Sequence, residues 1–269
     1  MARYAVNGID VFVDQVNPLG MKTLVLLHGF TGSTKTWQHV VKALPKSVRC
    51  ILVDLTGHGQ TSAPKNVAVY SMTYQIDTLH ELFQQLHLEK FTLLGYSMGG
   101  RVALSYAVKY TDKVEQLVLE SASPGLKSEE ERAARKEADD ALAEKILANG
   151  IESFVDKWEN IALFASQKLL SEYVQQEIRT ERLQQRAIGL ANSLRGMGTG
   201  VMPNLWDDLT ILPMPVTLLT GALDEKFVTL NEKMQNLLTH AKHLTIPAVG
   251  HAIHVENPLK FATIVEEMI

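Results

Sequence analysis

The segment that most constrains the fold runs from Phe91 to Ala107, where an apolar run leads through the sequence GYSMG (Gly95–Gly99) into a helical pattern. This sequence matches G-x-S-x-G, which between a strand and a helix forms a tight turn that presents a serine above a parallel sheet. A Cβ atom at position 95 or 99 would collide with the neighbouring strand or helix, so both positions require glycine. The segment therefore predicts a Ser97 hydroxyl at the N-terminus of a helix, whose free N–H groups face whatever that hydroxyl attacks.

Apolar runs of strand length recur along the chain and alternate with patterns of helix length. The expected strands are Tyr4–Val6, Ile9–Gln15, Thr23–Leu27, Val48–Asp54, Phe91–Leu94, Val114–Glu120, Val216–Thr220 and His243–Ile246. The expected helices of the core are Trp37–Leu44, Met72–Leu86, the one after Ser97, Leu230–Leu238 and a last one from Pro258. Asn7-Gly8 predicts an opening hairpin, and the later strand–helix alternation is typical of a doubly wound sheet. We therefore predict an α/β fold with a mostly parallel eight-stranded sheet flanked by helices.

The character of the chain changes after Gly125. From Ser128 to Leu205 it is charged, helical in pattern and poor in strand signals, and Ser128 with Glu131 forms a capping-box pattern. Strand–helix alternation resumes afterwards. We expect a helical cap over residues 126–205, inserted after the sixth strand and lying over the sheet edge where Ser97 emerges. Residues 1–125 and 206–269 would then form the core.

Composition excludes several classes of protein. A net charge of −4 over 269 residues argues against a nucleic-acid partner. The single cysteine, Cys50, excludes an intrachain disulfide and is expected to be a core thiol in a reducing compartment. No apolar run reaches the ~18 residues of a membrane span, and the N-terminus lacks a signal-peptide pattern. We expect a cytoplasmic protein, monomeric or weakly homo-oligomeric, with no metal or other cofactor, because neither metal-ligand spacing nor a glycine-rich phosphate loop is found.

A serine hydroxyl becomes an effective nucleophile or base only when another group takes its proton, so a histidine and a carboxylate are required. Asp224 follows one expected strand in a G-x-x-D loop, and His251 follows the last strand after a glycine. Open α/β sheets place their sites at these carboxyl ends of strands. We predict the triad Ser97, Asp224 and His251, in the chain order that G-x-S-x-G proteins use. His254 and Glu120 are the alternative base and acid, and the turn sequences favour His251 and Asp224 over them.

The turn after the third expected strand, with sequence HGF, can aim a backbone N–H into the cleft. We predict that the N–H groups of Phe30 and Met98 form an oxyanion hole. His28 receives no proton-transfer role. Asp54 and His58 follow the next strand and could suggest a second triad, but such a turn is more typical of a structural loop whose polar side chains bond the backbone.

Arg101 lies one helical turn beyond Ser97 on the same helix face. A desolvated guanidinium is costly unless it meets an anion, so Arg101 indicates either a bound anionic substrate or a salt bridge to a neighbouring carboxylate, and both interpretations stay open. Within the expected cap, Arg135 can pair with Glu131 at i, i+4. The arginines of the cap are Arg132, Arg135, Arg179, Arg182 and Arg186. A cationic cleft in an acidic protein would suit a small molecule with several carboxylates.

Motifs along nearly the whole chain resemble the MenH family, the 2-succinyl-6-hydroxy-2,4-cyclohexadiene-1-carboxylate synthases of menaquinone biosynthesis. The matching segments are LHGFTGS (27–33), DLTGHG (54–59), GYSMGGRVAL (95–104), ESASPGL with EEERAAR (120–135), FVDKWENIALFAS (154–166), GALDEKF (221–227) and GHAIHVENP (250–258). The HG, G-x-S-x-G and GH pieces are general to the α/β-hydrolase fold. Arg101 after the elbow, the stretch up to Arg135 and the run from Trp158 to Phe164 are the discriminating ones.

The resemblance implies an α/β-hydrolase fold and a carbon–oxygen lyase that eliminates pyruvate from 2-succinyl-5-enolpyruvyl-6-hydroxy-3-cyclohexene-1-carboxylate. It also implies a substrate pocket, with the match loosest at its last member. The residues carried over to that pocket are Tyr96, Arg101, Arg135, Trp158, Phe164 and Arg182. Two alternatives remain: a serine esterase or C–C bond hydrolase of a carboxylated small molecule, and a non-catalytic ligand-binding protein.

Overall fold

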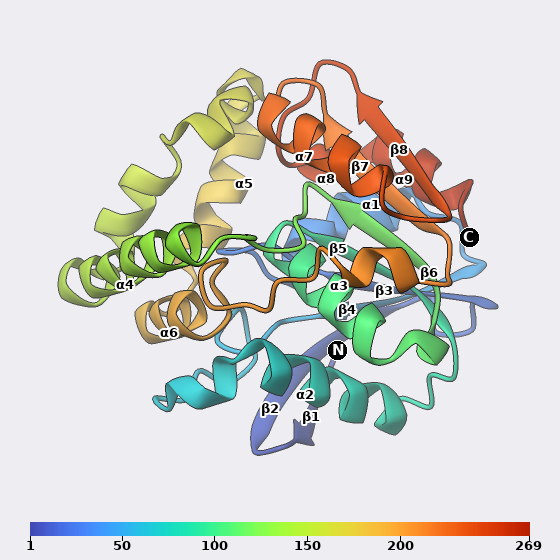
Figure 1. Cartoon of the computed structure of the whole chain (residues 1–269), viewed down its shortest axis with the longest axis horizontal. Helices are drawn as coiled ribbons and strands as arrows, with labels where there is room; N and C mark the ends of the chain where they lie inside the picture. The colour runs from blue at the N-terminus through green and yellow to red at the C-terminus, as the bar shows by residue number, and fades with distance from the viewer.

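The computed structural model describes residues 1–269 and contains one eight-stranded sheet with helices on both faces (Figure 1). The strand order is β1-β2-β4-β3-β5-β6-β7-β8. The strands are β1 (Ala2–Val6), β2 (Ile9–Val16), β3 (Lys22–Leu27), β4 (Val48–Val53), β5 (Phe91–Tyr96), β6 (Val114–Glu120), β7 (Val216–Gly221) and β8 (Ala241–Ile246). The predicted number of strands and their order along the chain are confirmed.

The first two strands form the predicted hairpin. Asn7 and Gly8 both have positive φ angles, 49° and 75°, as a tight two-residue hairpin turn requires. β2 also pairs antiparallel with β4, whereas all pairings among β3 to β8 themselves are parallel. The sheet is therefore mostly parallel, and the carboxyl ends of β3, β5, β6, β7 and β8 lie at one edge.

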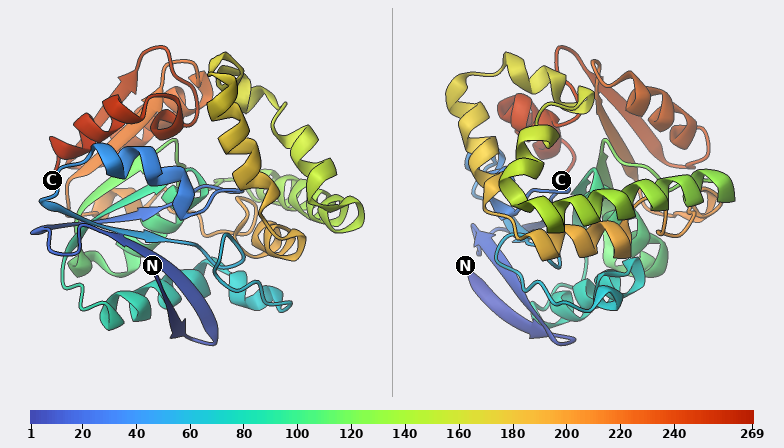
Figure 2. Two further views of the ribbon diagram at one scale, coloured as in Figure 1. Left: turned by 180° about the vertical axis from the view of Figure 1, so that it is seen from behind. Right: turned by 90° about the vertical axis from the view of Figure 1, so that its left-hand side faces the viewer.

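The sheet has a hydrophobic core on each face, and its central strands contribute side chains to both. In β3, Leu24 and Leu26 pack on one face while Val25 and Leu27 pack on the other, because side chains alternate along a strand. Helices α2 (Met72–Gln85) and α3 (Met98–Lys109) cover the larger core, and α1 (Gln38–Ala43) and α9 (Pro258–Glu266) cover the smaller one (Figure 2). Cys50 is buried in the smaller core, and burial raises the pKa of its thiol to about 12.

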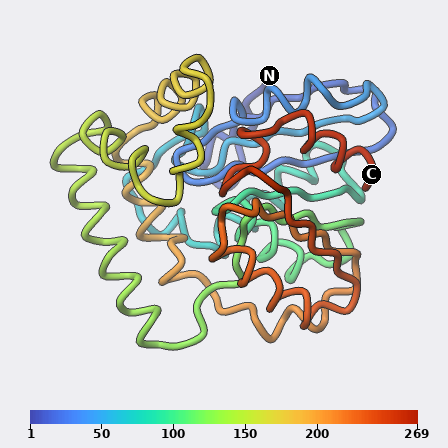
Figure 3. Tube along the Cα trace, turned by 90° about the horizontal axis from the view of Figure 1, so that it is seen from above, coloured from blue at the N-terminus to red at the C-terminus, as the bar shows by residue number.

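Three helices between β6 and β7 lie together at one end of the molecule (Figures 1 and 3). They are α4 (Glu129–Trp158), α5 (Glu172–Leu183) and α6 (Ala187–Met197), joined by the 3₁₀ helix η4 (Ala162–Leu169). The predicted capping box at Ser128 and Glu131 is present at the start of α4. Gly150, with φ 80° and ψ 174°, breaks α4, and α4 and α6 share a small apolar cluster of their own.

Two helix predictions need correction. The helix expected over Trp37–Leu44 is the 3₁₀ helix η1 (Thr34–Trp37) followed by α1. The helix expected over Leu230–Leu238 is α7 (Glu225–Gln235), which begins earlier because Asp224 is its N-cap and accepts a hydrogen bond from the Phe227 N–H at 3.4 Å. The remaining short elements are η2 (Val67–Tyr70), η3 (Thr111–Lys113), η5 (Asp208–Ile211) and α8 (Ile253–Glu256). None of the helices combines the length and apolar character that crossing a membrane would demand.

Candidate active site

The sharp turn between β5 and α3 holds Ser97 in an unusual backbone conformation. Its φ is 51° and its ψ is −106°, a strained region that costs on the order of 1–3 kcal/mol. An added Cβ at Gly95 would strike the backbone of Gly99, and one at Gly99 would strike the backbone of Leu27 and His28. The Ser97 N–H donates to the Glu120 carbonyl at 2.8 Å, which ties the turn to β6.

His251 and Asp224 meet Ser97 as the predicted triad requires. The Ser97 Oγ lies 3.0 Å from His251 Nε2, and His251 Nδ1 lies 2.6 Å from Asp224 Oδ2. Because a carboxylate only accepts hydrogen bonds, Nδ1 carries the proton and Nε2 is left to accept from the serine. His251 is almost completely buried, so its ring has little freedom to leave this orientation.

Glu256 holds the loop that carries His251. Its carboxylate accepts from the Gly250 N–H at 2.6 Å and the Ala252 N–H at 3.4 Å, on either side of the histidine. It also accepts from the Ser166 hydroxyl at 3.0 Å, which belongs to η4. Burial raises the pKa of Glu256, and these donors oppose that rise. The histidine loop is therefore joined directly to the helical insert.

The alternative residues, His254 and Glu120, form a second pair of their own. His254 Nδ1 lies 2.8 Å from Glu120 Oε2, and His254 Nε2 lies 2.9 Å from the Thr36 hydroxyl. The His254 and Glu120 side chains are both fully enclosed, and neither lines the cavity over Ser97. The structure therefore gives each histidine its own acid, and only the pair preferred from the sequence reaches Ser97.

The N–H groups predicted to form an oxyanion hole have no acceptor within the protein. Phe30 follows β3, and Met98 is the first residue of α3, where a helix offers no acceptor of its own. Both residues line the cavity above the serine. The preceding His28 is occupied elsewhere, because its Nε2 accepts from the Leu55 N–H at 3.0 Å and burial lowers its pKa.

A cavity of about 200 Å³ lies above Ser97, between the sheet edge and the helical insert. The aromatic rings of its wall are in mutual contact, with Trp158 at 5.5 Å from Phe30 and 5.8 Å from Phe164 between ring centroids. Five of the six residues carried over to the substrate pocket line this cavity together with Ser97 and His251. They are Tyr96, Arg101, Arg135, Trp158 and Phe164.

Two arginines supply positive charge to this cavity. Arg101 forms no salt bridge: its Nη1 donates to the Met197 carbonyl at 2.6 Å, and burial, with repulsion from Arg135, lowers its pKa to about 10. Arg135 pairs with Asp139 at 2.9 Å rather than with Glu131, whose side chain caps α4 instead. Arg101 therefore remains charged at neutral pH without a carboxylate partner.

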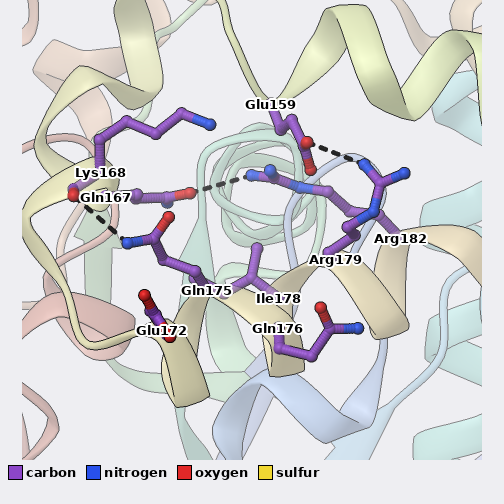
Figure 4. A pocket seen from close by; sticks show the side chains of 9 residues that line it. All are labelled: Glu159, Gln167, Lys168, Glu172, Gln175, Gln176, Ile178, Arg179 and Arg182. Carbon is purple, nitrogen blue, oxygen red and sulfur yellow. Dashed lines mark hydrogen bonds and ion pairs between the residues drawn. The ribbon is translucent and has the colours of Figure 1, made fainter.

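The sixth carried-over residue, Arg182, does not line the cavity above Ser97. Its Nη2 donates to Gln167 Oε1 at 3.1 Å, and its guanidinium lies 4.5 Å from the centroid of the Phe164 ring. It faces a separate polar hollow between η4 and α5, beside the ion pair of Arg179 with Glu159 (Figure 4). Phe164 lines both the cavity over Ser97 and the small one next to Arg182.

Known proteins resemble this chain both in a general fold family and in a narrower set of named relatives. Residues 22–258 match the family model described as the alpha/beta hydrolase fold. A Bacillus subtilis (strain 168) protein provisionally named 2-succinyl-6-hydroxy-2,4-cyclohexadiene-1-carboxylate synthase is 46% identical, over 98% of this chain and 96% of its own. The synthase of that name from Enterobacter sp. (strain 638) is 31% identical over 93% and 92%.

The structure of MenH from S. aureus superposes with a TM-score of 0.90 at 38% identity, over 95% of this chain and 96% of that one. The chain belongs to the MenH family of the α/β-hydrolase fold. The family resemblance and the fold predicted from the sequence are therefore both confirmed.

This MenH-family site also contains residues that the sequence did not single out. Asp139, one turn after Arg135 on α4, lines the cavity, and its spacing from that arginine is the signal that could have revealed it. Lys226 and Phe227 line it from the first turn of α7, directly after Asp224. They were missed because this stretch was expected to be loop.

Proposed function

We propose that this protein eliminates pyruvate from 2-succinyl-5-enolpyruvyl-6-hydroxy-3-cyclohexene-1-carboxylate in menaquinone biosynthesis. The product is 2-succinyl-6-hydroxy-2,4-cyclohexadiene-1-carboxylate. Family membership supports the reaction. The observation that carries it to this site is the placement of Arg101 and Arg135 in one cavity with a histidine-bonded serine.

In this proposal Ser97 acts as a base. The ring carbon next to the succinyl carbonyl loses its proton to Ser97 Oγ as the serine proton moves to His251 Nε2, and Asp224 stabilises the imidazolium. The electron pair of the broken C–H bond moves toward the succinyl carbonyl oxygen, which the N–H groups of Phe30 and Met98 stabilise. The electron pair then moves back from the enolate oxygen into the ring and shifts the ring double bond, which breaks the C–O bond to enolpyruvate. Enolpyruvate becomes pyruvate on taking up a proton.

The substrate suits the walls of the cavity. Each of its succinyl, enolpyruvyl and ring carboxylate groups bears a negative charge, and a carboxylate bound by a guanidinium in a partly dry site forms a strong charge-assisted hydrogen bond. Tyr96, Trp158 and Phe164 add apolar surface for the ring. Burial raises the pKa of Tyr96 well above its usual value, so its phenol remains neutral and does not repel the carboxylates.

The test is to supply the purified enzyme with the intermediate generated in situ, and to follow pyruvate together with the absorbance of the cyclohexadiene. Stoichiometric appearance of both is expected, and Ser97→Ala is the control. Fast hydrolysis of p-nitrophenyl esters without elimination would favour the esterase or C–C hydrolase alternative and reject the synthase.

We further infer that residues 126–205 act as a cap on a core of residues 1–125 and 206–269. Hydrogen bonds between Ser33 and Glu181 at 2.6 Å and between Ser166 and Glu256 support this assignment. The protein would work in the cytoplasm as a monomer or weak homo-oligomer, without metal, cofactor or nucleic acid. Sedimentation and activity after dialysis against EDTA test the oligomeric state and the metal independence.

A further inference from the structure

Lys226 is a third cationic residue in the wall of the cavity. It falls within the matching segment GALDEKF (221–227), but the predicted pocket did not include it. It lies in the first turn of α7, two residues after Asp224. It lines both the cavity over Ser97 and an outer groove of about 520 Å³ between η4 and the Asp224 loop. Leu163 is the only other residue shared by these two spaces, so Lys226 lies at the mouth between them.

The Lys226 side chain is exposed, and no carboxylate of the protein holds its ammonium group. It forms no salt bridge, and its Nζ lies 5.9 Å from the centroid of the Phe227 ring, too far for a strong cation–π contact. A cation in the first turn also opposes the helix dipole, which favours negative groups there. Lys226 therefore does not stabilise α7, and a ligand is the partner that its position suits.

The charges that line the cavity leave room for such a partner. Arg101, Arg135 and Lys226 are positive, and Asp139 is the one acidic residue of the lining, already paired with Arg135. Glu225 lines only the outer groove, and the Asp224 carboxylate bonds His251. A substrate with three carboxylates would place more negative charge here than the two arginines can match.

Resting on the proposed function, we propose that Lys226 binds the carboxylate of the enolpyruvyl group, the group that leaves. The leaving group must pass the mouth of the cavity, where Lys226 lies. Arg101 and Arg135 lie instead on the wall formed by α3 and α4. An ammonium on a flexible stem can follow a departing anion, whereas a guanidinium fork holds a fixed one.

The test compares Lys226→Gln and Lys226→Arg with Lys233→Gln, an exposed lysine two turns further along α7. Lys226→Gln should lower kcat/KM for elimination about 10-fold, mainly through KM, because a partly exposed charge-assisted bond is lost. Lys226→Arg should recover most of the loss, and Lys233→Gln should match the wild type.

Product inhibition distinguishes which carboxylate Lys226 binds. The diene product has lost the enolpyruvyl carboxylate, so its inhibition constant should stay the same in Lys226→Gln while KM for the substrate rises. Unchanged KM, or product inhibition weakened as much as substrate binding, would overturn the assignment. If the wild-type enzyme releases no pyruvate at all, the proposed function fails instead, and the two failures are thereby separated.

Discussion

Two histidine–carboxylate pairs lie side by side in this protein, and only one of them reaches the cavity over Ser97. His251 and His254 are three residues apart, and Tyr96 packs between them at 5.4 and 4.6 Å between ring centroids. Each donates Nδ1–H toward a carboxylate and turns Nε2 toward a hydroxyl, Ser97 in one case and Thr36 in the other.

The difference lies in what surrounds each hydroxyl. Ser97 has a strained backbone, two N–H groups without acceptors near it and a cavity above it. Thr36 also lines hollows beside α5, but it lies within η1, where its own N–H donates to the Ser33 carbonyl at 3.3 Å. The ring of Trp37 covers His254 at 4.3 Å between ring centroids. A buried histidine–acid pair is therefore not by itself a catalytic device. The strained hydroxyl and the prearranged N–H donors around it decide what the pair can do.

The largest expected effect is the loss of elimination in Ser97→Ala. We expect kcat to fall about 10⁴-fold, since removing the proton relay leaves only binding and the oxyanion donors. Thr36→Val, which removes the equivalent hydroxyl from the second pair, should leave kcat within a few-fold of the wild type. Single-turnover kinetics on both variants provide the measurement. A loss of rate in Thr36→Val as large as in Ser97→Ala would contradict the distinction between the two pairs.

The second pair should show its importance in stability instead. His254→Ala leaves the fully enclosed Glu120 carboxylate without its ring partner, and breaking a buried pair costs about 3–5 kcal/mol of unfolding free energy. His251→Ala should cost less, because Asp224 lines the outer groove, where water can reach it, and keeps the Phe227 N–H as a donor. Urea denaturation measures both variants, and equal losses would contradict the division of roles.

The arginines that line the cavity over Ser97 provide the next test. Arg101→Ala should reduce kcat/KM by roughly 30- to 1000-fold, about 2–4 kcal/mol of transition-state stabilisation, by removing one charge-assisted bond to the substrate. Arg195→Ala is the matched control, because Arg195 lies outside the cavity and pairs with Glu144 on the surface of the helical insert. Wild-type kinetics in Arg101→Ala would remove that residue from the site.

The smallest effect concerns pH and a carboxylate where the helical insert contacts the core. Glu181 accepts from Ser33, and burial raises its pKa from 4.5 to about 7. The folded state therefore binds the extra proton between these two values, so this carboxylate lowers stability progressively as the pH rises through that window.

Glu181→Gln should consequently be more stable than the wild type by about 1–3 kcal/mol at pH 8, with the difference shrinking to under about 1 kcal/mol at pH 5. Urea denaturation at both pH values gives the comparison. A difference that does not change with pH would show that Glu181 titrates normally.

Features set by local backbone chemistry were predictable from the sequence. The glycines around Ser97 cannot be replaced without a clash, and Asn7-Gly8 makes a hairpin turn. The apolar runs of strand length became the eight strands, in the expected order along the chain. The turn of Asp54 and His58 was also predicted as structural, and Asp54 accepts from the Thr34 and Gln60 N–H groups at 2.6 and 2.7 Å.

Pairings between distant segments were decided only by the tertiary structure. Glu120 ends β6 and Asp224 follows β7, while His251 and His254 are only three residues apart. The turn sequences favoured one combination but could not show where the other pair would go. How α4, α5 and α7 lie against the sheet edge decided three further features. These are the pairing of Arg135 with Asp139, the position of Arg182 outside the cavity, and the position of Lys226 at the cavity mouth. Sequence periodicity determines which residues an element buries, but the direction in which a polar side chain points is set by neighbours that become close only after folding.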